Sequence, residues 1–205
     1  TNANIPGPVL IRPERPGDYC EAENLTREAF WNLMGPGCDE HYLLHVMRGD
    51  ASFISELDFV AETGSKIIGN IVYTKSAVSA GTKTLETITF GPVGVLPEYQ
   101  KNGVGARLIR HTLDLARQMG FAAVVFLGHP EYYPRLGFKR GSDYGLTLPD
   151  GQAPDALMAL ELIPGSLSAL GGGVYHYADI YNVDQAAAEA FDTRFPPKEK
   201  KDPQQ

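Results

Sequence analysis

Hydrophobic positions repeat with two different periods along this chain, and the period predicts the type of each element. Short apolar or alternating runs predict strands at residues 9–12, 84–90, 121–127, 145–148 and 156–162. Two further runs, residues 59–63 and 66–78, are separated only by Gly64-Ser65, which predicts a hairpin. Strands therefore alternate with helices over most of the chain, as expected for an α/β domain.

A spacing of three to four residues between apolar positions predicts helices at residues 15–33, 39–48 and 184–195. The first helix begins near Pro16-Gly17-Asp18, and Gly35-Pro36-Gly37 separates it from the second. A further helix begins near Val104 and ends at Gly120. Its apolar half contains Val104, Leu108, Ile109, Leu113, Leu115, Ala116 and Met119. We expect this helix to bury one face on a sheet.

The segment between the strand at 84–90 and this helix is rich in residues that permit close approach to the backbone. Gly103 and Gly105 have no Cβ atom, and they follow Gln100 and Asn102. Exposed N–H groups at a helix start, with the positive end of the helix dipole behind them, bind phosphate well. The segment therefore predicts a site for a phosphorylated ligand.

Spacing separates the phosphate loops that could fit here. A nucleotide-triphosphate loop requires Gly-x-x-x-x-Gly-Lys-Ser/Thr, and neither the lysine nor the hydroxyl follows at the required place. A dinucleotide loop requires a third glycine where Leu108 stands. What remains is Gln100-x-x-Gly103-x-Gly105, or a tight glycine turn without a ligand.

The pattern Gln100-x-x-Gly103-x-Gly105 resembles the acetyl-CoA pyrophosphate loop of the GNAT N-acetyltransferase superfamily. The resemblance implies that acetyl-CoA binds at Gln100, Lys101, Asn102, Gly103, Val104, Gly105 and Ala106. A second GNAT signature is similar to Tyr133-x-x-x-Gly137-Phe138. It implies that Tyr133 is the general acid that protonates the departing thiolate, a role that suits a phenol. An ordinary packed tyrosine is the alternative.

The strand before the loop contains residues that weaken its hydrogen bonding to neighbouring strands. Pro92 has no N–H, and Gly91 and Gly94 lack side chains, so a bulge or a splayed edge is expected. By resemblance the sheet opens here, and backbone groups of Val93, Gly94 and Val95 bind the pantetheine arm and the acetyl carbonyl. A kinked core strand without a ligand is the alternative. Many GNAT proteins have a polar residue before the short helix, and this chain lacks it. His129 is either its polar substitute or a solvated loop residue.

The general base is not identified by the sequence. Some relatives use a glutamate where this chain has Thr89. The other acids nearby are Glu86 on the same strand, and Glu56, Asp58 and Glu62 near the strand at 59–63. A water relay, or an amine that arrives neutral, is an equal alternative.

Cys38-x-x-His41-x-x-x-His45 invites a metal interpretation, because two histidines four residues apart share a helix face. Tyr42 stands where a hydrolase motif would need glutamate, and no fourth ligand is evident. We therefore predict no metal. The resemblance instead implies that His41, His45, Trp31 and Phe30 border the acceptor pocket.

Composition limits the class of protein and of partner. The chain has 205 residues and a formal net charge of -7, which argues against a nucleic-acid partner. Two cysteines are too few for a disulfide framework, so a reducing compartment is expected. No run approaches the roughly 20 apolar residues of a membrane span. The first residues lack a secretion-signal pattern, which favours a cytoplasmic, membrane-free protein.

Together these features predict an α/β GNAT fold, with a mixed, mostly antiparallel sheet splayed at its middle strands and helices on both faces. Residues 1–163 would form the acetyltransferase domain, 164–195 an extension packed on it, and 196–205 a disordered tail. The predicted function is direct acetyl transfer from acetyl-CoA to a small-molecule or peptide amine. A non-catalytic acyl-CoA-binding module and a metal-dependent hydrolase are the alternatives. Monomer and homodimer are both open.

Overall fold

The structure is a computed structural model that describes residue 5 and residues 7–203. Its contacts divide the chain into two compact units. The first is formed by the chain up to residue 72, by residues 91–109, and by the chain from 179 onward. The second is formed by residues 73–90 and 110–178. Each unit is described separately below, although β3, β4 and α3 run from one into the other.

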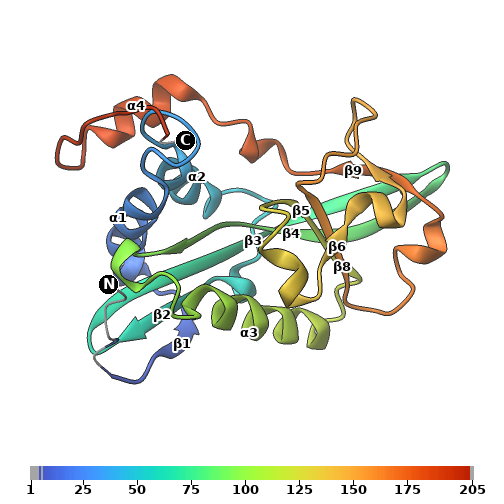
Figure 1. Ribbon diagram of the computed structural model, residues 1–205, viewed down its shortest axis with the longest axis horizontal. Helices are drawn as coiled ribbons and strands as arrows, with labels where there is room; N and C mark the ends of the chain where they lie inside the picture. The colour runs from blue at the N-terminus through green and yellow to red at the C-terminus, as the bar shows by residue number, and fades with distance from the viewer. Residues whose placement is uncertain (1–4, 6, 204–205) are drawn as a thin grey trace. The chain divides into compact units, whose positions relative to one another are not determined.

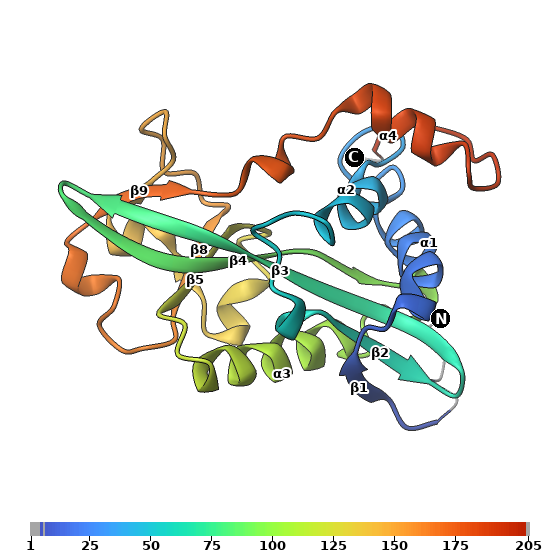
Figure 2. The same cartoon turned by 180° about the vertical axis from the view of Figure 1, so that it is seen from behind.

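The first unit contains an antiparallel ladder of three strands. Strand β1 (Leu10–Pro13) pairs with β2 (Phe59–Thr63), which pairs with the first part of β3 (Lys66–Ala80), as Figure 2 shows. Leu10 lies opposite Glu62, and Phe59 lies opposite Ile71. The predicted hairpin between β2 and β3 is confirmed, because Gly64 has a φ of 62° that a two-residue turn requires.

Three helices belong to the first unit: α1 (Tyr19–Phe30), α2 (Glu40–Met47) and α4 (Gln185–Asp192). Helix α2 contacts both α1 and α4, and Figure 1 shows α4 beside α2. An apolar cluster joins α1 and α2 to β3, and it consists of Ala22, Leu43, Leu44, Met47 and Val72. Helix α1 is shorter than predicted: residues 16–18 form a separate 3-10 turn, and Asn32 takes a left-handed φ of 58° just beyond its end.

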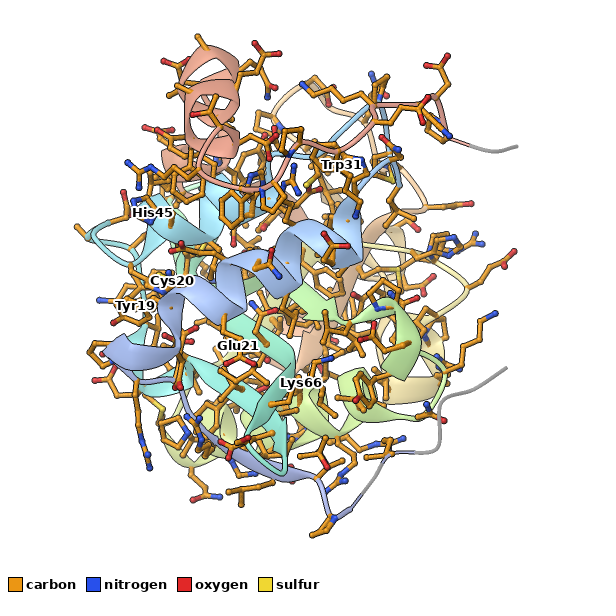
Figure 3. The ribbon with its side chains drawn as sticks, turned by 90° about the vertical axis from the view of Figure 1, so that its left-hand side faces the viewer. Tyr19, Cys20, Glu21, Trp31, His45 and Lys66 are labelled. Carbon is orange, nitrogen blue, oxygen red and sulfur yellow. The ribbon has the colours of Figure 1, made fainter. Side chains whose placement is uncertain are left out.

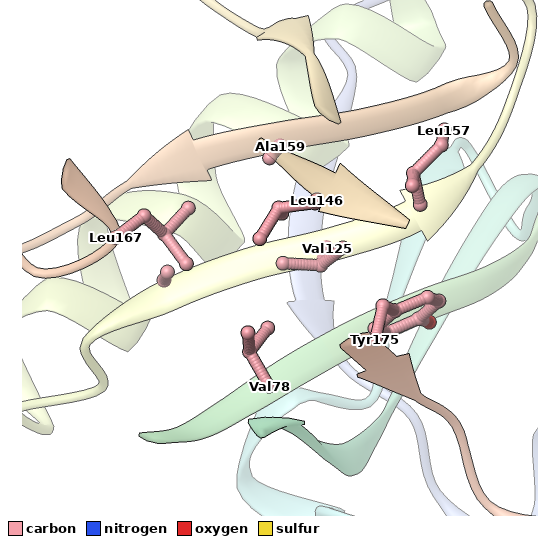
Figure 4. Close-up of a cluster of buried hydrophobic side chains, with 8 residues drawn as sticks. Val78, Val125, Leu146, Leu157, Ala159, Leu167 and Tyr175 are labelled. Atoms are coloured by element: carbon pink, nitrogen blue, oxygen red, sulfur yellow. The ribbon is translucent and has the colours of Figure 1, made fainter. Parts of the chain in front are cut away.

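The second unit contains the rest of β3 and the first part of β4 (Lys83–Val95). With them lie β5 (Ala123–Leu127), β6 (Lys139–Arg140), β7 (Leu146–Thr147), β8 (Leu157–Glu161) and β9 (Gly173–His176). Strand β5 runs parallel to β4, with Ile88 opposite Val124, and antiparallel to β8. Figure 4 shows the apolar cluster at its centre: Val78, Ala123, Val125, Leu146, Leu157, Ala159, Leu167 and Tyr175.

Hydrogen-bonded neighbours follow the order β1-β2-β3-β4-β5-β8-β6, and β9 pairs with β3 and β7. Most of these pairs are antiparallel, so the predicted mixed α/β fold class is confirmed. The splay between the middle strands, and the division of the chain at residues 163 and 195, stay predictions.

Two details of the predicted elements were wrong. The strand expected at 84–90 continues to Val95, because Pro92 and the glycines lie within β4 rather than ending it. Strand β9 is absent from the predicted elements, because it is a four-residue strand that begins with glycine and has no clear hydrophobic period. Helix α3 (Val104–Gln118) lies within its predicted bounds, and Gly120 follows it with a φ of 84°.

Candidate functional site: a glycine loop and a buried tyrosine

The loop between β4 and α3 is held in a conformation that few residues adopt. A 3-10 turn (Pro97–Tyr99) leaves β4, and then Lys101 and Gly103 have φ values of 63° and 78°. The Gln100 side chain links the loop to the end of β4, because its Nε2 donates to the carbonyl oxygen of Val95 at 3.0 Å. Gln100 therefore shapes the loop through a contact inside the protein.

These backbone conformations leave a row of N–H groups without acceptors. In the described part of the chain, no protein atom accepts a hydrogen bond from the backbone N–H of Lys101, Gly103, Val104, Gly105 or Ala106. The first bond of the helix is donated by Arg107 to the Gly103 carbonyl oxygen, at 3.0 Å. A Cβ atom built on Gly103 would meet nothing within 4 Å, so the space before the loop is open. Such a row suits an anion.

Glycines also allow the start of α3 to lie close to the strands. A Cβ on Gly69 would lie 3.1 Å from side-chain carbons of Val104 and Leu108, and 3.2 Å from the Gly94 carbonyl oxygen. A Cβ on Gly94 would lie 2.6 Å from Oδ1 of Asn70. Sequence reasoning missed Gly69, although a glycine inside an apolar strand is a known mark of close backbone approach.

The charged side chains near the loop have different roles. Arg107, near the start of α3, donates to the Val9 carbonyl oxygen at 2.8 Å. Lys66 pairs with Glu98 at 3.0 Å. Lys101 is exposed, and no carboxylate in the described residues pairs with it. Of these cations, Lys101 is the one left to face an anion at the loop.

Tyr133 lies in the second unit, and the local geometry explains the spacing of its sequence motif. It begins a 3-10 turn (Tyr133–Leu136) that ends at Gly137, whose φ of 93° only glycine adopts readily. The turn sends Phe138 back toward Tyr133, with ring centroids 5.7 Å apart. Phe126 and Phe90 complete the cluster, 4.6 Å and 5.7 Å from Tyr133. The ring of Tyr133 is thus fixed on three sides.

The hydroxyl of Tyr133 has no hydrogen-bond partner in the part of the chain that the structure describes. Burial raises the pKa of Tyr133 to about 12, with a further contribution from Tyr132. The group therefore stays protonated at neutral pH and can donate a proton. Tyr132 is placed differently, because the Arg135 guanidinium lies 3.8 Å from the centre of its ring.

Gly128 is the residue that leaves room for the Tyr133 ring. A Cβ there would lie 2.6 Å from Cε2 of Tyr133 and would also overlap the ring of Phe126. We expect Gly128→Ala to lower the free energy of unfolding by about 1–3 kcal/mol, the usual cost of overpacking. Chemical denaturation measures this. Gly35→Ala is the control, because a Cβ at Gly35 meets nothing within 4 Å, and equal stabilities of the two variants would contradict the packing.

Thr89, at the position where some relatives have a base, is fully engaged in hydrogen bonds. Its hydroxyl donates to the Val125 carbonyl oxygen at 2.8 Å. Since that uses its only hydrogen, the Tyr175 hydroxyl, 2.6 Å away, must be the donor in the second bond. Thr89 therefore ties β4 to β5 and β9, and the structure gives it no free basic atom.

The acidic candidates near β2 and β4 are also poorly suited to act as a base. Glu56 and Glu86 are exposed, and Glu62 accepts a hydrogen bond from Arg12. Asp58 is buried; burial, and then the neighbouring Glu14, raise its pKa to about 9. A carboxyl group with that pKa is protonated at neutral pH, so Asp58 is not a base there. The general base stays unidentified.

Of Cys38, His41 and His45, the first two are in contact, since Sγ of Cys38 lies 3.5 Å from Nδ1 of His41. His41 is fully buried, and its Nε2 lies 3.0 Å from Oδ1 of Asp192, out of line for a hydrogen bond. His45 instead contacts Glu23 at 2.9 Å. Burial raises the pKa of the Cys38 thiol to about 12, which makes it unreactive. Within the described residues, no group of three or more His, Cys, Asp or Glu side chains could hold a metal ion.

The C-terminal segment, which consists of α4 and the residues after it, contacts the end of α1. Arg27, whose side chain is 2 % exposed, pairs with Asp192 of α4 at 2.5 Å. The Arg27 guanidinium and the Lys198 ammonium lie 4.2 Å and 5.6 Å from the centre of the Trp31 ring (Figure 3), whose Nε1 donates to the Glu199 carbonyl oxygen. Of the four residues expected at the acceptor pocket, His41 and Trp31 are therefore covered by this segment.

Comparison with known proteins covers the part of the chain that contains the loop and the tyrosine motif. Residues 55–140 match the family model of the acetyltransferase (GNAT) domain. The chain is 28% identical, over 169 residues, to the Escherichia coli protein named uncharacterized N-acetyltransferase YhbS, covering 82% of this chain and 96% of YhbS. Residues 55–140 are therefore assigned to the GNAT superfamily. A second Escherichia coli relative, the uncharacterized N-acetyltransferase YjhQ, is 38% identical over 90 residues, and this match covers 50% of its length.

Solved GNAT structures share the fold. The crystal structure of Escherichia coli YhbS in complex with CoA has a TM-score of 0.74, at 26% identity, and covers 85% of this GNAT chain and 92% of YhbS. A Brucella melitensis GNAT acetyltransferase in complex with acetyl-CoA has a TM-score of 0.65, also at 26% identity, covering 85% and 98%. No helix in the described residues of this GNAT protein is long and apolar enough to cross a membrane.

Proposed function

We propose that this GNAT protein transfers the acetyl group of acetyl-CoA directly to an amine. The observation that carries the proposal is the row of backbone N–H groups of Lys101, Gly103, Val104, Gly105 and Ala106, which have no acceptor among the described residues and open onto free space at the start of α3. The related YhbS and Brucella proteins, whose structures contain CoA and acetyl-CoA, support the same ligand here. The loop binds the pyrophosphate, with Lys101 as its nearest free cation.

Each part of the chain then has a defined task. Acetyl-CoA, when bound, supplies the acetyl group as a thioester. Backbone groups of Val93, Gly94 and Val95 on β4 orient the pantetheine arm and polarise the acetyl carbonyl, which is the main electrostatic aid to acyl transfer. Tyr133, protonated and without a hydrogen-bond partner inside the described protein, donates its proton to the departing sulfur.

The acceptor is an amine that must be neutral when it attacks. A cavity of about 250 Å³ opens at the connection between α1 and α2, next to Met34, which is 84% exposed. Asp39 and Glu40 line it, and neither pairs with a cation among the described residues. Unpaired carboxylates attract a protonated amine to this entrance, and the apolar Phe30 and Met34 suit an amine with a hydrocarbon body.

Gly103→Glu tests the proposal. A side chain and a negative charge would then occupy the space before the N–H row, so we expect acetyl-CoA binding to fall below detection. Isothermal titration calorimetry measures this affinity, and acetyl transfer to a panel of amines measures the activity.

The matched control is Gly64→Glu. Gly64 also has a positive φ and open space around it, so this change brings equal backbone strain and equal charge to the β2–β3 turn. If Gly103→Glu binds acetyl-CoA as tightly as Gly64→Glu does, the loop is not the pyrophosphate site. If Gly103→Glu loses acetyl-CoA binding but the wild-type protein acetylates no amine of the panel, the protein is an acyl-CoA-binding module instead.

A further inference from the structure

A second cavity, of about 370 Å³, opens between α2 and α4 in the first unit. Both helices present residues at spacings of three and four, the spacing that puts side chains on one helix face. Its lining consists of Tyr42, His45 and Val46 from α2, with Ala187, Ala190, Phe191 and Arg194 from α4 and the turn that follows it. Figure 3 shows His45 on the side of α2 that faces α4.

The sequence of α4 explains why the two helices leave a hollow. Ala187, which is partly buried, and Ala190, which is exposed, have only methyl groups on the side of α4 that lines the cavity. Phe191 forms an aromatic wall, with its ring centroid 4.5 Å from that of His45 and 5.6 Å from that of Tyr42. The cavity therefore has an apolar body of methyl groups and aromatic rings.

Three hydrogen-bonding groups line the same cavity without being fully engaged. The Arg194 guanidinium lies 4.8 Å from the centre of the Phe191 ring, and no carboxylate in the described chain pairs with it. The Tyr42 hydroxyl has no hydrogen-bond partner among the same residues. His45 uses Nδ1 to contact Glu23, which leaves Nε2 as its other polar atom. No acidic residue is part of the lining.

We propose that this cavity binds a small organic carboxylate with an aromatic body. The guanidinium of Arg194 can hold a carboxylate through two parallel hydrogen bonds, and the Tyr42 hydroxyl can donate a further one. The ligand's ring packs against Phe191 and the two alanines. The volume is at the small end of known ligand pockets, which suits a single ring with a short acidic side chain.

Binding here also acts on the C-terminal segment. The walls come from α2 and α4, so a bound carboxylate joins the two helices. Asp192, next to Phe191, holds α4 to Arg27 and lies beside His41. A ligand that binds only when α4 is docked stabilises the docked state by mass action. The cavity shares no lining residue with the acetyl-CoA loop, and binding there does not depend on the proposed acetyl transfer.

Isothermal titration calorimetry with phenylacetate tests the site. We expect saturable binding in the millimolar range, and at least about tenfold weaker binding of phenylacetamide, its neutral counterpart, because hydrogen bonds to charged groups are the stronger ones. 2-Phenylethylamine provides the opposite charge. Equal binding of the amide, displacement of phenylacetate by the amine, or no binding of phenylacetate at all would each overturn the proposal.

Variants locate the binding site. Arg194→Gln should weaken phenylacetate binding by about tenfold. Arg117→Gln, which changes an exposed arginine of α3, should leave it unchanged. Ala190→Leu fills the cavity at an exposed position, so the fold is retained while binding is lost. Full binding by both Arg194→Gln and Ala190→Leu would show that phenylacetate binds elsewhere and would overturn the assignment.

Discussion

Replacement of Tyr133 by phenylalanine is expected to lower the turnover number of acetyl transfer by at least about tenfold. General acid catalysis contributes about 10²–10⁴-fold, and water can take over part of the role. The ring stays in its cluster of Phe90, Phe126 and Phe138, so stability and acetyl-CoA affinity should change little. Steady-state kinetics with an accepted amine, or slow hydrolysis of acetyl-CoA, measures the change.

Tyr132→Phe is the control, because Tyr132 is adjacent but is paired with Arg135, and it should keep near wild-type turnover. The pH profile provides a second check. Burial raises the pKa of Tyr133 to about 12, so its proton is present at every pH well below that value. Any fall in rate near neutral pH must then come from another group and should persist in Tyr133→Phe. Full turnover of Tyr133→Phe, with chemistry rate-limiting, would make Tyr133 a packing residue.

Asp192→Ala is expected to lower the free energy of unfolding by about 3 kcal/mol, because breaking a buried ion pair leaves an uncompensated charge. The Arg27 and His41 side chains are 2% and 0% exposed, and both face Asp192. The value is at the low end of the usual range because the Asp192 side chain is itself 21% exposed. A loss of this size corresponds to a fall in Tm of about 6–12 °C for a chain of this length.

Glu189→Ala is the matched control on α4, since Glu189 is 72% exposed and its contact with Lys200 is 3.6 Å long. It should cost less than about 1 kcal/mol. Burial by itself raises the pKa of Asp192, but the Arg27 hydrogen bond and charge lower it overall. The stabilisation by Asp192 is therefore present above its ordinary pKa and is lost as the pH falls through the lowered one. A difference between wild type and Asp192→Ala that does not shrink in acid would contradict this.

Several parts of this structure could be predicted because their signals are local. The β2–β3 hairpin follows from Gly64-Ser65 between two apolar runs, and α3 follows from the spacing of its apolar residues. The N–H row follows from Gly103 and Gly105 at a helix start. The Tyr133 motif also has a local cause, since Gly137 must take a left-handed conformation for Phe138 to return to the tyrosine ring.

Other parts depend on contacts that no local pattern contains. Arg27 looks like a solvated position on α1, and its partner Asp192 follows 165 residues later. Strand β9 forms because Tyr175 pairs with Val78, far earlier in the chain. In the sequence alone, a short strand that begins with the last of three consecutive glycines resembles a loop. The room that Gly128 leaves for Tyr133 is likewise evident only when both rings are in place.

The position of Trp31 makes the docking of the C-terminal segment directly observable. It is the only tryptophan in the chain, its ring contacts the cations of Arg27 and Lys198, and its Nε1 donates to the Glu199 carbonyl oxygen. Its fluorescence emission therefore reports on this one contact, without any added label. Release of the segment would expose the indole to water and move its emission to longer wavelength while the circular dichroism of the sheet stays the same. Local detachment and global unfolding can thus be distinguished in a single sample.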